Sequence, residues 1–189
     1  MRSIIVLAIL FVLIGLTILS YHYDVPFQMY SIGQEVDQLN DIPVYYNGPS
    51  PSVHGENISD KGYYLGVKWQ CVEFVRRYYY QHFNHEMPSS RGNAKDYFNH
   101  TLEEGGLNQE RNLFQFINGG ESMPNVGDIL ILTGGYGHVG IVTLVESDVI
   151  EIIQQNVNKC TRKKFNVIKV NQSITIQGET ILGLLSLKP

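Results

Sequence analysis

Cysteine is scarce in this chain of 189 residues, which has only Cys71 and Cys160. Two cysteines cannot form the network of disulfides that stabilises many small secreted domains. A single disulfide between them would block any thiol chemistry at Cys71. We therefore expect both thiols to be free.

The spacings that usually indicate a metal site are also missing. The chain has six histidines but no HExxH, no paired CxxC and no EF-hand pattern, so the sequence predicts no metal and no cofactor. A basic surface is missing too, because 14 Lys and Arg residues are outnumbered by 18 Asp and Glu residues. The one dense basic cluster, Arg162–Lys164, is typical of a solvated turn. Nucleic acid is therefore not an expected partner.

One long apolar run is present near the amino terminus. Residues 4–19 carry no charge and would form a helix about 24 Å long, a little short of a hydrocarbon core roughly 30 Å thick. Arg2 precedes the run and acidic residues follow it, so the positive-inside rule keeps the amino end in the cytoplasm. We expect residues 1–23 to be a single-pass N-terminal membrane-anchor helix, with residues 24–189 as an extracytoplasmic catalytic domain. A cleaved signal segment is the alternative.

The spacing of apolar residues changes along the rest of the chain. Residues 23–62 are rich in Pro, Gly, Asn and Ser and predict loops with one short strand near 44–46. Later patterns predict a helix over 70–83, a weaker helix over 93–98 and a short helical turn at 113–117. Strands are predicted at 129–132, 138–145, 149–154, 165–170 and 181–187. Helices followed by antiparallel strands indicate an α+β fold.

Cys71 stands at the start of the helix predicted over residues 70–83. A helix N-terminus offers backbone N–H groups and the positive end of the helix dipole, and both favour a thiolate. A lone cysteine at such a position is more often a small buried hydrophobe. A catalytic role for Cys71 therefore depends on a second element elsewhere in the chain.

That element is a glycine-rich hairpin that ends in His138. The run Gly134–His138 predicts a tight turn, with the histidine opening the next strand on the same side as Gly140. A catalytic imidazole needs a third group to fix its tautomer and orientation. Gln154 and Asn156 are two residues apart near the end of the following strand, so either could orient His138. The alternative is that His138 merely caps a hairpin.

The run Trp69-Gln70-Cys71-Val72-Glu73-Phe74 resembles the nucleophile motif of CHAP amidohydrolases, most closely the amidase domain of glutathionylspermidine synthetase/amidase. The resemblance continues through Gly137–Thr143, Gln155–Val157 and Thr180–Gly183. It implies a papain-like (CHAP) fold, in which the nucleophile helix packs on an antiparallel β-sheet.

The same resemblance implies roles for individual residues. Cys71 is the nucleophile, His138 the base, Gln70 with the Cys71 amide an oxyanion site, and Arg76 a substrate-binding residue. Asn156 falls where the family has supporting polar groups. The chain departs from the family at Gln154, where the family has an acidic residue.

The activity that the resemblance implies is hydrolysis, because nothing in the chain resembles an ATP-grasp synthetase. We expect a cysteine amidase or peptidase that forms an acyl-enzyme on a small peptide-like amide, such as a glutathionylspermidine-type conjugate. The anchor indicates peptidoglycan stem peptides as the alternative substrate. A non-catalytic binding module is the alternative from another class.

Overall fold

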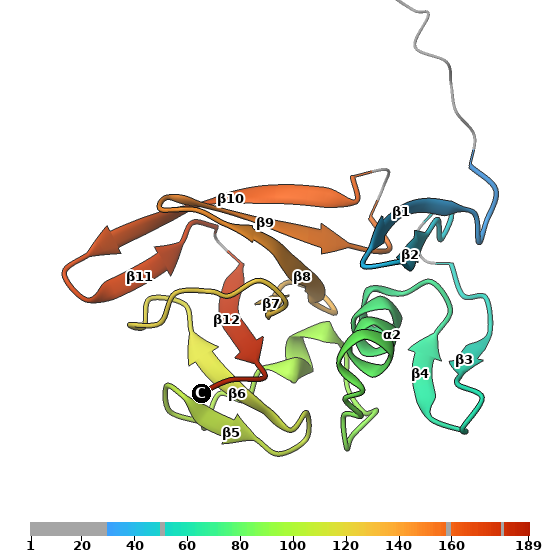
Figure 1. Cartoon of the computed structure of the whole chain (residues 1–189), viewed down its shortest axis with the longest axis horizontal. Coiled ribbons are helices and arrows are strands. Elements are labelled where there is room, and N and C mark those ends of the chain that lie inside the picture. Colours follow the sequence, from blue (N-terminus) through green and yellow to red (C-terminus); the bar gives the residue numbers. More distant parts are fainter. Residues whose placement is uncertain (1–29, 50–51, 158–159, 179) are drawn as a thin grey trace, which may run out of the picture. The chain divides into compact units, whose positions relative to one another are not determined.

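The structure is a computed structural model that describes residues 30–49, 52–157, 160–178 and 180–189. Residues 31–189 form one folded unit. Its elements in chain order (Figure 1) are β1 (Glu35–Leu39), β2 (Ile42–Tyr45), β3 (Glu56–Ile58), β4 (Tyr64–Val67), α2 (Cys71–Phe83), the 3-10 helix η1 (Ala94–Tyr97), β5 (Gly106–Asn108), β6 (Leu113–Ile117), β7 (Ile129–Leu132), β8 (His138–Val145), β9 (Val149–Gln154), β10 (Arg162–Val170), β11 (Ser173–Ile176) and β12 (Ile181–Ser186).

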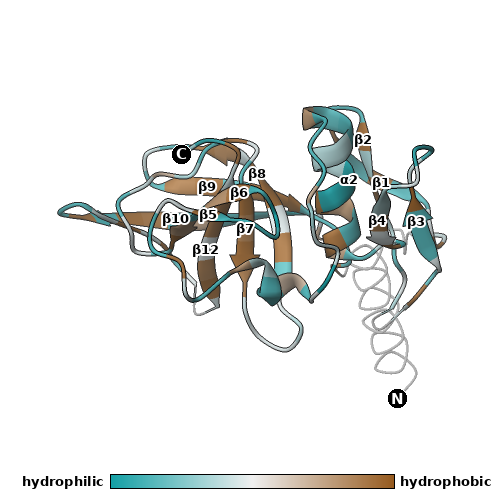
Figure 2. Ribbon diagram, turned by 90° about the horizontal axis from the view of Figure 1, so that it is seen from below, coloured by the Kyte–Doolittle hydropathy of each residue, from teal (hydrophilic) through white to brown (hydrophobic). Residues whose placement is uncertain are grey.

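Eight strands form one antiparallel sheet in the order β11-β10-β9-β8-β7-β12-β6-β5. Strand β7 is buried along its whole length, and Figure 2 shows apolar residues along the central strands. Toward the edge, β10 buries Phe165 and Val167 while their neighbours are exposed, as expected for a strand with one covered face. The hairpins β1–β2 and β3–β4 lie outside this sheet.

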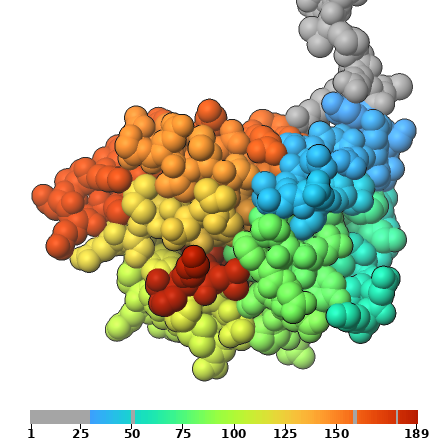
Figure 3. Space-filling model, in the orientation of Figure 1, coloured from blue at the N-terminus to red at the C-terminus, as the bar shows by residue number. Residues whose placement is uncertain are grey.

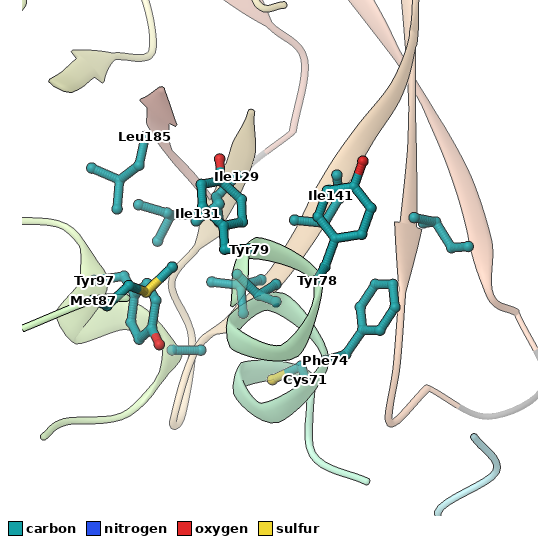
Figure 4. Packing of buried hydrophobic residues seen from close by; sticks show 14 of the residues in the cluster. Cys71, Phe74, Tyr78, Tyr79, Met87, Tyr97, Ile129, Ile131, Ile141 and Leu185 are labelled. Atoms are coloured by element: carbon teal, nitrogen blue, oxygen red, sulfur yellow. The ribbon is translucent and has the colours of Figure 1, made fainter. Parts of the chain in front are cut away.

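Helix α2 packs its apolar stripe into the core. Phe74, Tyr78 and Tyr79 recur at helical spacing and are at most 2% exposed, and Figure 4 shows them among residues of the sheet. Burying a side chain of this size contributes roughly 1.5–3 kcal/mol. The helix ends after Phe83 because Asn84 adopts a left-handed φ of 50° and its N–H bonds back to the carbonyl of Tyr79.

Several elements predicted from the sequence are confirmed. The helix over 70–83 is α2, and the strands over 129–132, 138–145 and 149–154 are β7, β8 and β9. The weaker helix over 93–98 is the 3-10 turn η1.

Two predictions of secondary structure and fold class were wrong. Residues 113–117 form strand β6 rather than a helical turn, because Leu113 and Gln115 alternate inward with the period of a strand. The α+β class is corrected as well. Most of the regular secondary structure in the described ranges is antiparallel sheet, and α2 is the single α-helix among the described residues.

The predicted anchor over residues 1–23 lies outside the described residues. Within the described part of the chain, no helix is long and apolar enough to cross a membrane. The prediction of a single-pass, membrane-anchored protein with an extracytoplasmic domain is corrected on this finding. The division into residues 1–23 and 24–189 stays a prediction.

Candidate active site

Cys71 is the first residue of α2, and its side chain is buried with 8% of its surface exposed. The helix has no side-chain cap at Gln70. Instead, the backbone N–H groups of Cys71 and Val72 donate hydrogen bonds to the Cys71 sulfur, and so does the N–H of Val139. The thiol therefore sits where the N-terminus of α2 meets the start of β8.

Two opposing effects act on the pKa of the Cys71 thiol. Burial raises the pKa because a thiolate is poorly solvated there, whereas the three backbone N–H donors lower it. Burial is the larger effect, so the pKa lies above its ordinary value. At neutral pH the sulfur is held as a thiol.

The hairpin before β8 fixes the place of His138. Gly134, Gly135 and Gly137 all have left-handed φ values, of 100°, 54° and 78°. A Cβ at Gly137 would lie 2.4 Å from the backbone nitrogen of Lys95, so only glycine fits against η1. His138 is half-buried and immediately precedes Val139, whose N–H reaches the Cys71 sulfur. The structure thus brings Cys71 and His138 to the same end of β8.

Gln154 reaches His138 across the ladder between β8 and β9. Gly140 pairs directly with Gln154 and lies on the same side of β8 as His138. A Cβ at Gly140 would lie 2.9 Å from the carbonyl oxygen of Ile153, so glycine allows this close approach. The Gln154 side chain hydrogen-bonds the imidazole of His138. Of the two residues predicted as orienting groups, Gln154 is the one that contacts His138, and its orienting role stays a prediction.

The Gln154 amide presents its oxygen to His138. Gln154 Nε2 donates to the carbonyl oxygen of Cys160 at 2.9 Å, so Gln154 Oε1 is the atom left to accept from the imidazole. His138 Nε2 is buried without a hydrogen-bond partner among the described residues. We therefore expect Nδ1 to carry the proton and to face Gln154 Oε1, with a lone pair on Nε2.

The pKa of His138 is lowered, mainly by burial. The hydrogen bond to Gln154 raises the pKa and the positive charge of Lys163 lowers it further, but neither outweighs burial. His138 therefore rests as a neutral imidazole. Together with the neutral thiol of Cys71, this favours a neutral pair over a thiolate–imidazolium pair at rest.

Asn156 does not join Gln154 at the imidazole. Strand β9 ends at Gln154, and Asn156 has a left-handed φ of 63°, so the alternation of a strand does not extend to it. Its Nδ2 donates to Gln70 Oε1 at 2.6 Å. Gln70 Nε2 in turn donates to the carbonyl oxygen of Ser52 at 2.7 Å. The residue predicted as an alternative orienter thus contacts the residue predicted as the oxyanion donor.

Arg76 is 2% exposed, and its guanidinium is engaged within the protein. Nε and Nη2 donate to the carbonyl of Tyr64, and Nη1 donates to the carbonyl of Ser89 at 2.8 Å. The guanidinium also lies 4.8 Å from the ring centre of Tyr63. A substrate-binding role for Arg76 stays a prediction.

A buried polar network that the sequence analysis missed joins α2 to the segment after β9. Glu73 forms an ion pair with Arg77 at 2.6 Å, and Gln155 Nε2 donates to Glu73 Oε2 at 2.8 Å and to the Gln70 carbonyl at 3.0 Å. Asn57 Nδ2 donates to Glu73 Oε1. The spacing of four residues between Glu73 and Arg77 was the available signal.

The groups in this region that could bind a metal ion are the sulfur of Cys71 and the imidazole of His138. In the described ranges, no group of three or more His, Cys, Asp or Glu side chains could hold a metal ion. The chemistry that this arrangement can perform with its own groups is nucleophilic attack by a thiol with an imidazole as base.

Known proteins resemble this chain over about half to three fifths of its length. It is 34% identical over 100 residues to the bifunctional glutathionylspermidine synthetase/amidase of Escherichia coli (strain K12), covering 50% of this chain and 16% of that protein. It is 28% identical over 119 residues to trypanothione synthetase of Crithidia fasciculata, covering 61% and 18%. With glutathionylspermidine synthase of that organism the identity is 34% over 109 residues, covering 49% and 14%. The chain thus spans less than a fifth of the length of these curated relatives.

A sequence model of the CHAP domain matches residues 62–156. The matched segment contains α2 with Cys71, the hairpin that ends in His138, and β9 with Gln154. The CHAP domain itself fits a papain-like fold. Because this match covers about half of the sequence, the chain belongs to the CHAP domain family.

Proposed function

We propose that this protein is a cysteine amidase that hydrolyses a peptide-like C–N amide bond through an acyl-enzyme on Cys71. The contact between the start of α2 and the start of β8 carries the proposal, since Val139, the residue after His138, donates its N–H to the Cys71 sulfur, and the imidazole of His138 contacts the neutral Gln154 amide. Membership of the CHAP family and similarity to a protein named as an amidase support a hydrolase that acts on amide bonds.

The first half of the reaction forms a thioester. His138 Nε2 takes the thiol proton as Cys71 Sγ attacks the amide carbon, and the negative charge on the substrate oxygen is stabilised by the Cys71 N–H and Gln70 Nε2. His138 then gives its proton to the departing nitrogen as the C–N bond breaks. A free amine leaves, and the acyl group stays on Cys71.

The second half consumes water. His138 Nε2 removes a proton from a water molecule that attacks the thioester carbon. The C–S bond breaks, the carboxylic acid is released, and the proton returns to the Cys71 sulfur. One amide and one water thus give one acid and one amine.

Gln154 suits this cycle because it orients the imidazole without adding a charge. A neutral partner leaves the pKa of His138 low, so the ring is ready to accept a proton at neutral pH. General base catalysis of this kind contributes about 10²–10⁴-fold to a rate. The cost of a neutral partner is weaker stabilisation of the imidazolium that forms during attack.

Thiol labelling tests the mechanism. In a Cys160→Ser background, iodoacetamide should label Cys71, and His138→Ala should slow that labelling strongly because the base is gone. Slow labelling that His138→Ala leaves unchanged would mean that Cys71 is not activated, and would favour a non-catalytic binding module.

The substrate class that we propose is a glutathionylspermidine-type conjugate, because two similar proteins are a glutathionylspermidine synthetase/amidase and a glutathionylspermidine synthase. The full chain is incubated with glutathionylspermidine and, separately, with purified peptidoglycan, and products are identified by mass spectrometry. Release of glutathione and spermidine by the wild type but not by Cys71→Ala supports the proposal. Release of stem-peptide fragments alone would assign the enzyme to peptidoglycan.

A further inference from the structure

Three side-chain amides and one backbone carbonyl form a closed ring of hydrogen bonds next to the nucleophile. Asn47 Nδ2 donates to Asn156 Oδ1 at 2.7 Å and to the Ser52 carbonyl oxygen at 3.3 Å. Asn156 Nδ2 donates to Gln70 Oε1 at 2.6 Å, and Gln70 Nε2 donates to the same Ser52 oxygen at 2.7 Å. Gln70 directly precedes Cys71, so one member of the ring is the sequence neighbour of the proposed nucleophile.

The ring fixes the orientation of every amide in it. A backbone carbonyl can only accept, so the NH₂ groups of Asn47 and Gln70 must both point at Ser52. Gln70 Oε1 then faces Asn156 and accepts a hydrogen bond from its NH₂ group. The oxygen of Asn156 accepts a hydrogen bond from the NH₂ group of Asn47. Rotating any one amide would set two acceptors, or two donors, against each other.

This orientation leaves a free donor on Gln70. Its NH₂ group has two hydrogens, of which one bonds the Ser52 oxygen. If the Gln70 amide turned over, an oxygen would take the place of this donor and would repel the oxyanion. An oxyanion site works because its donors are held in place before the reaction.

We propose that Asn47 is a positioning residue, acting through Asn156 to hold the Gln70 carboxamide with its free Nε2 hydrogen available to the oxyanion. The inference rests on the proposed function, because an oxyanion forms only if Cys71 attacks a carbonyl. Asn47 lies between β2 and β3, outside the segment that matches the CHAP domain. Figure 3 shows this part of the chain, in blue, against the green region that contains α2.

The surroundings of Asn47 favour a role beyond packing. The residue is 2% exposed, and its Oδ1 is buried without a hydrogen-bond partner among the described residues. Leaving a buried acceptor unpaired is costly, and a side chain selected for stability alone would avoid it. The NH₂ group, in contrast, makes two bonds. The Asn47 side chain therefore contributes to the ring through its NH₂ group alone.

The test compares two isosteric substitutions at buried asparagines. Asn47→Asp removes the NH₂ group and sets an acceptor against the Ser52 and Asn156 oxygens. Asn108→Asp is the matched control, because Asn108 is 4% exposed and also donates to a backbone carbonyl, of Tyr97, and to a side-chain amide, of Gln115. Asn156→Asp is a second variant of the ring, and aspartate tolerates its left-handed φ.

Two reagents separate the oxyanion site from the thiol itself. Acylation of Cys71 by p-nitrophenyl acetate, followed by release of p-nitrophenolate, passes through an oxyanion, whereas alkylation by iodoacetamide does not. Both are measured in the full chain with Cys160→Ser. We expect Asn47→Asp and Asn156→Asp to slow acylation at least tenfold, toward the roughly 10²–10³-fold typical of a lost oxyanion donor, with alkylation unchanged. Asn108→Asp should change neither rate.

Other outcomes overturn the inference. If Asn47→Asp acylates like Asn108→Asp, or if acylation and alkylation fall together in both ring variants, Asn47 does not position Gln70. If the wild type is alkylated but not acylated, or if its alkylation does not depend on His138, the proposed function itself has failed. The two failures are thus distinguishable.

Discussion

Gly140 on β8 lies directly opposite Gln154 on β9, and the absence of a side chain at this glycine is what lets the two strands approach. A Cβ there would lie 2.8 Å from Ile152 Cδ1 and 2.9 Å from the Ile153 carbonyl oxygen. The bond between Gln154 and His138 depends on this spacing. Gly140 therefore links the packing of the sheet to the contact between Gln154 and His138.

Gly140→Ala should lower both stability and activity. The added methyl group forces β9 away, and overpacking of this kind costs about 1–3 kcal/mol of unfolding free energy. Urea unfolding measures the loss, and the rate of Cys71 alkylation reports the displaced His138. Gly135→Asn is the control, because nothing lies within 4 Å of a Cβ there and asparagine tolerates its φ of 54°. Equal stability of the two variants would contradict the explanation.

Gln154→Glu should move the pH dependence of Cys71 alkylation to lower pH. A carboxylate against Nδ1 raises the pKa of His138, and the imidazolium so favoured lowers the pKa of the neighbouring thiol. The acidic limb of the alkylation profile therefore shifts downward. Turnover can change in either direction, because a more stable ion pair contains a weaker nucleophile.

Two further substitutions complete the pH experiment. Gln154→Ala removes the bond to Nδ1 and should also change the profile, whereas Asn156→Ala should leave it as in the wild type because Asn156 contacts Gln70 instead. Were both Gln154 variants to overlay the wild type while Asn156→Ala shifted, Asn156 would be the orienting residue.

Regular periodicity made part of the fold predictable. The stripe of α2 and the β-branched runs of β7, β8 and β9 are long enough for their period to be read from the sequence. Residues 113–117 were misjudged because five residues with one polar member fit either period. The polar member, Gln115, is fully buried because its side chain bonds the backbone of Asn99.

In the site, the sequence could place only those residues whose positions follow from a local pattern, such as a helix start or the alternation of a strand. Cys71, His138 and Gln154 each occupy a position that a helix start or a strand pair defines. Asn156 was placed by extending the alternation of β9, which its left-handed φ interrupts. The hydrogen bond between Asn47 and Asn156 spans 109 residues of sequence, and no spacing rule predicts such a pair.

Cys71→Ala and Cys71→Ser should abolish amide hydrolysis and leave the fold intact. Cys71 belongs to the buried core, so Cys71→Ala costs on the order of 1 kcal/mol of stability.

Cys160→Ser should keep nearly full activity, because Gln154 contacts the backbone carbonyl of Cys160 and not its sulfur. Product formation with glutathionylspermidine measures both. Turnover retained in either Cys71 variant would rule out the mechanism, and a large loss in Cys160→Ser would indicate a disulfide or a thiol relay.

Glu73→Gln should destabilise the protein far more than the loss of an exposed ion pair. Glu73 and Arg77 have 0% and 5% of their side chains exposed, and removing one partner of a buried pair costs about 3–5 kcal/mol because the other charge stays buried. Urea unfolding measures the loss. Arg162→Gln is the control, because Arg162 pairs with Asp37 while 38% of its own side chain is exposed. This substitution should cost at most about 1 kcal/mol of unfolding free energy.

The double change Glu73→Gln with Arg77→Met should recover part of the stability, because it removes the unpaired charge. A single Glu73→Gln substitution no more costly than Arg162→Gln would show that the buried pair does not hold α2 in place.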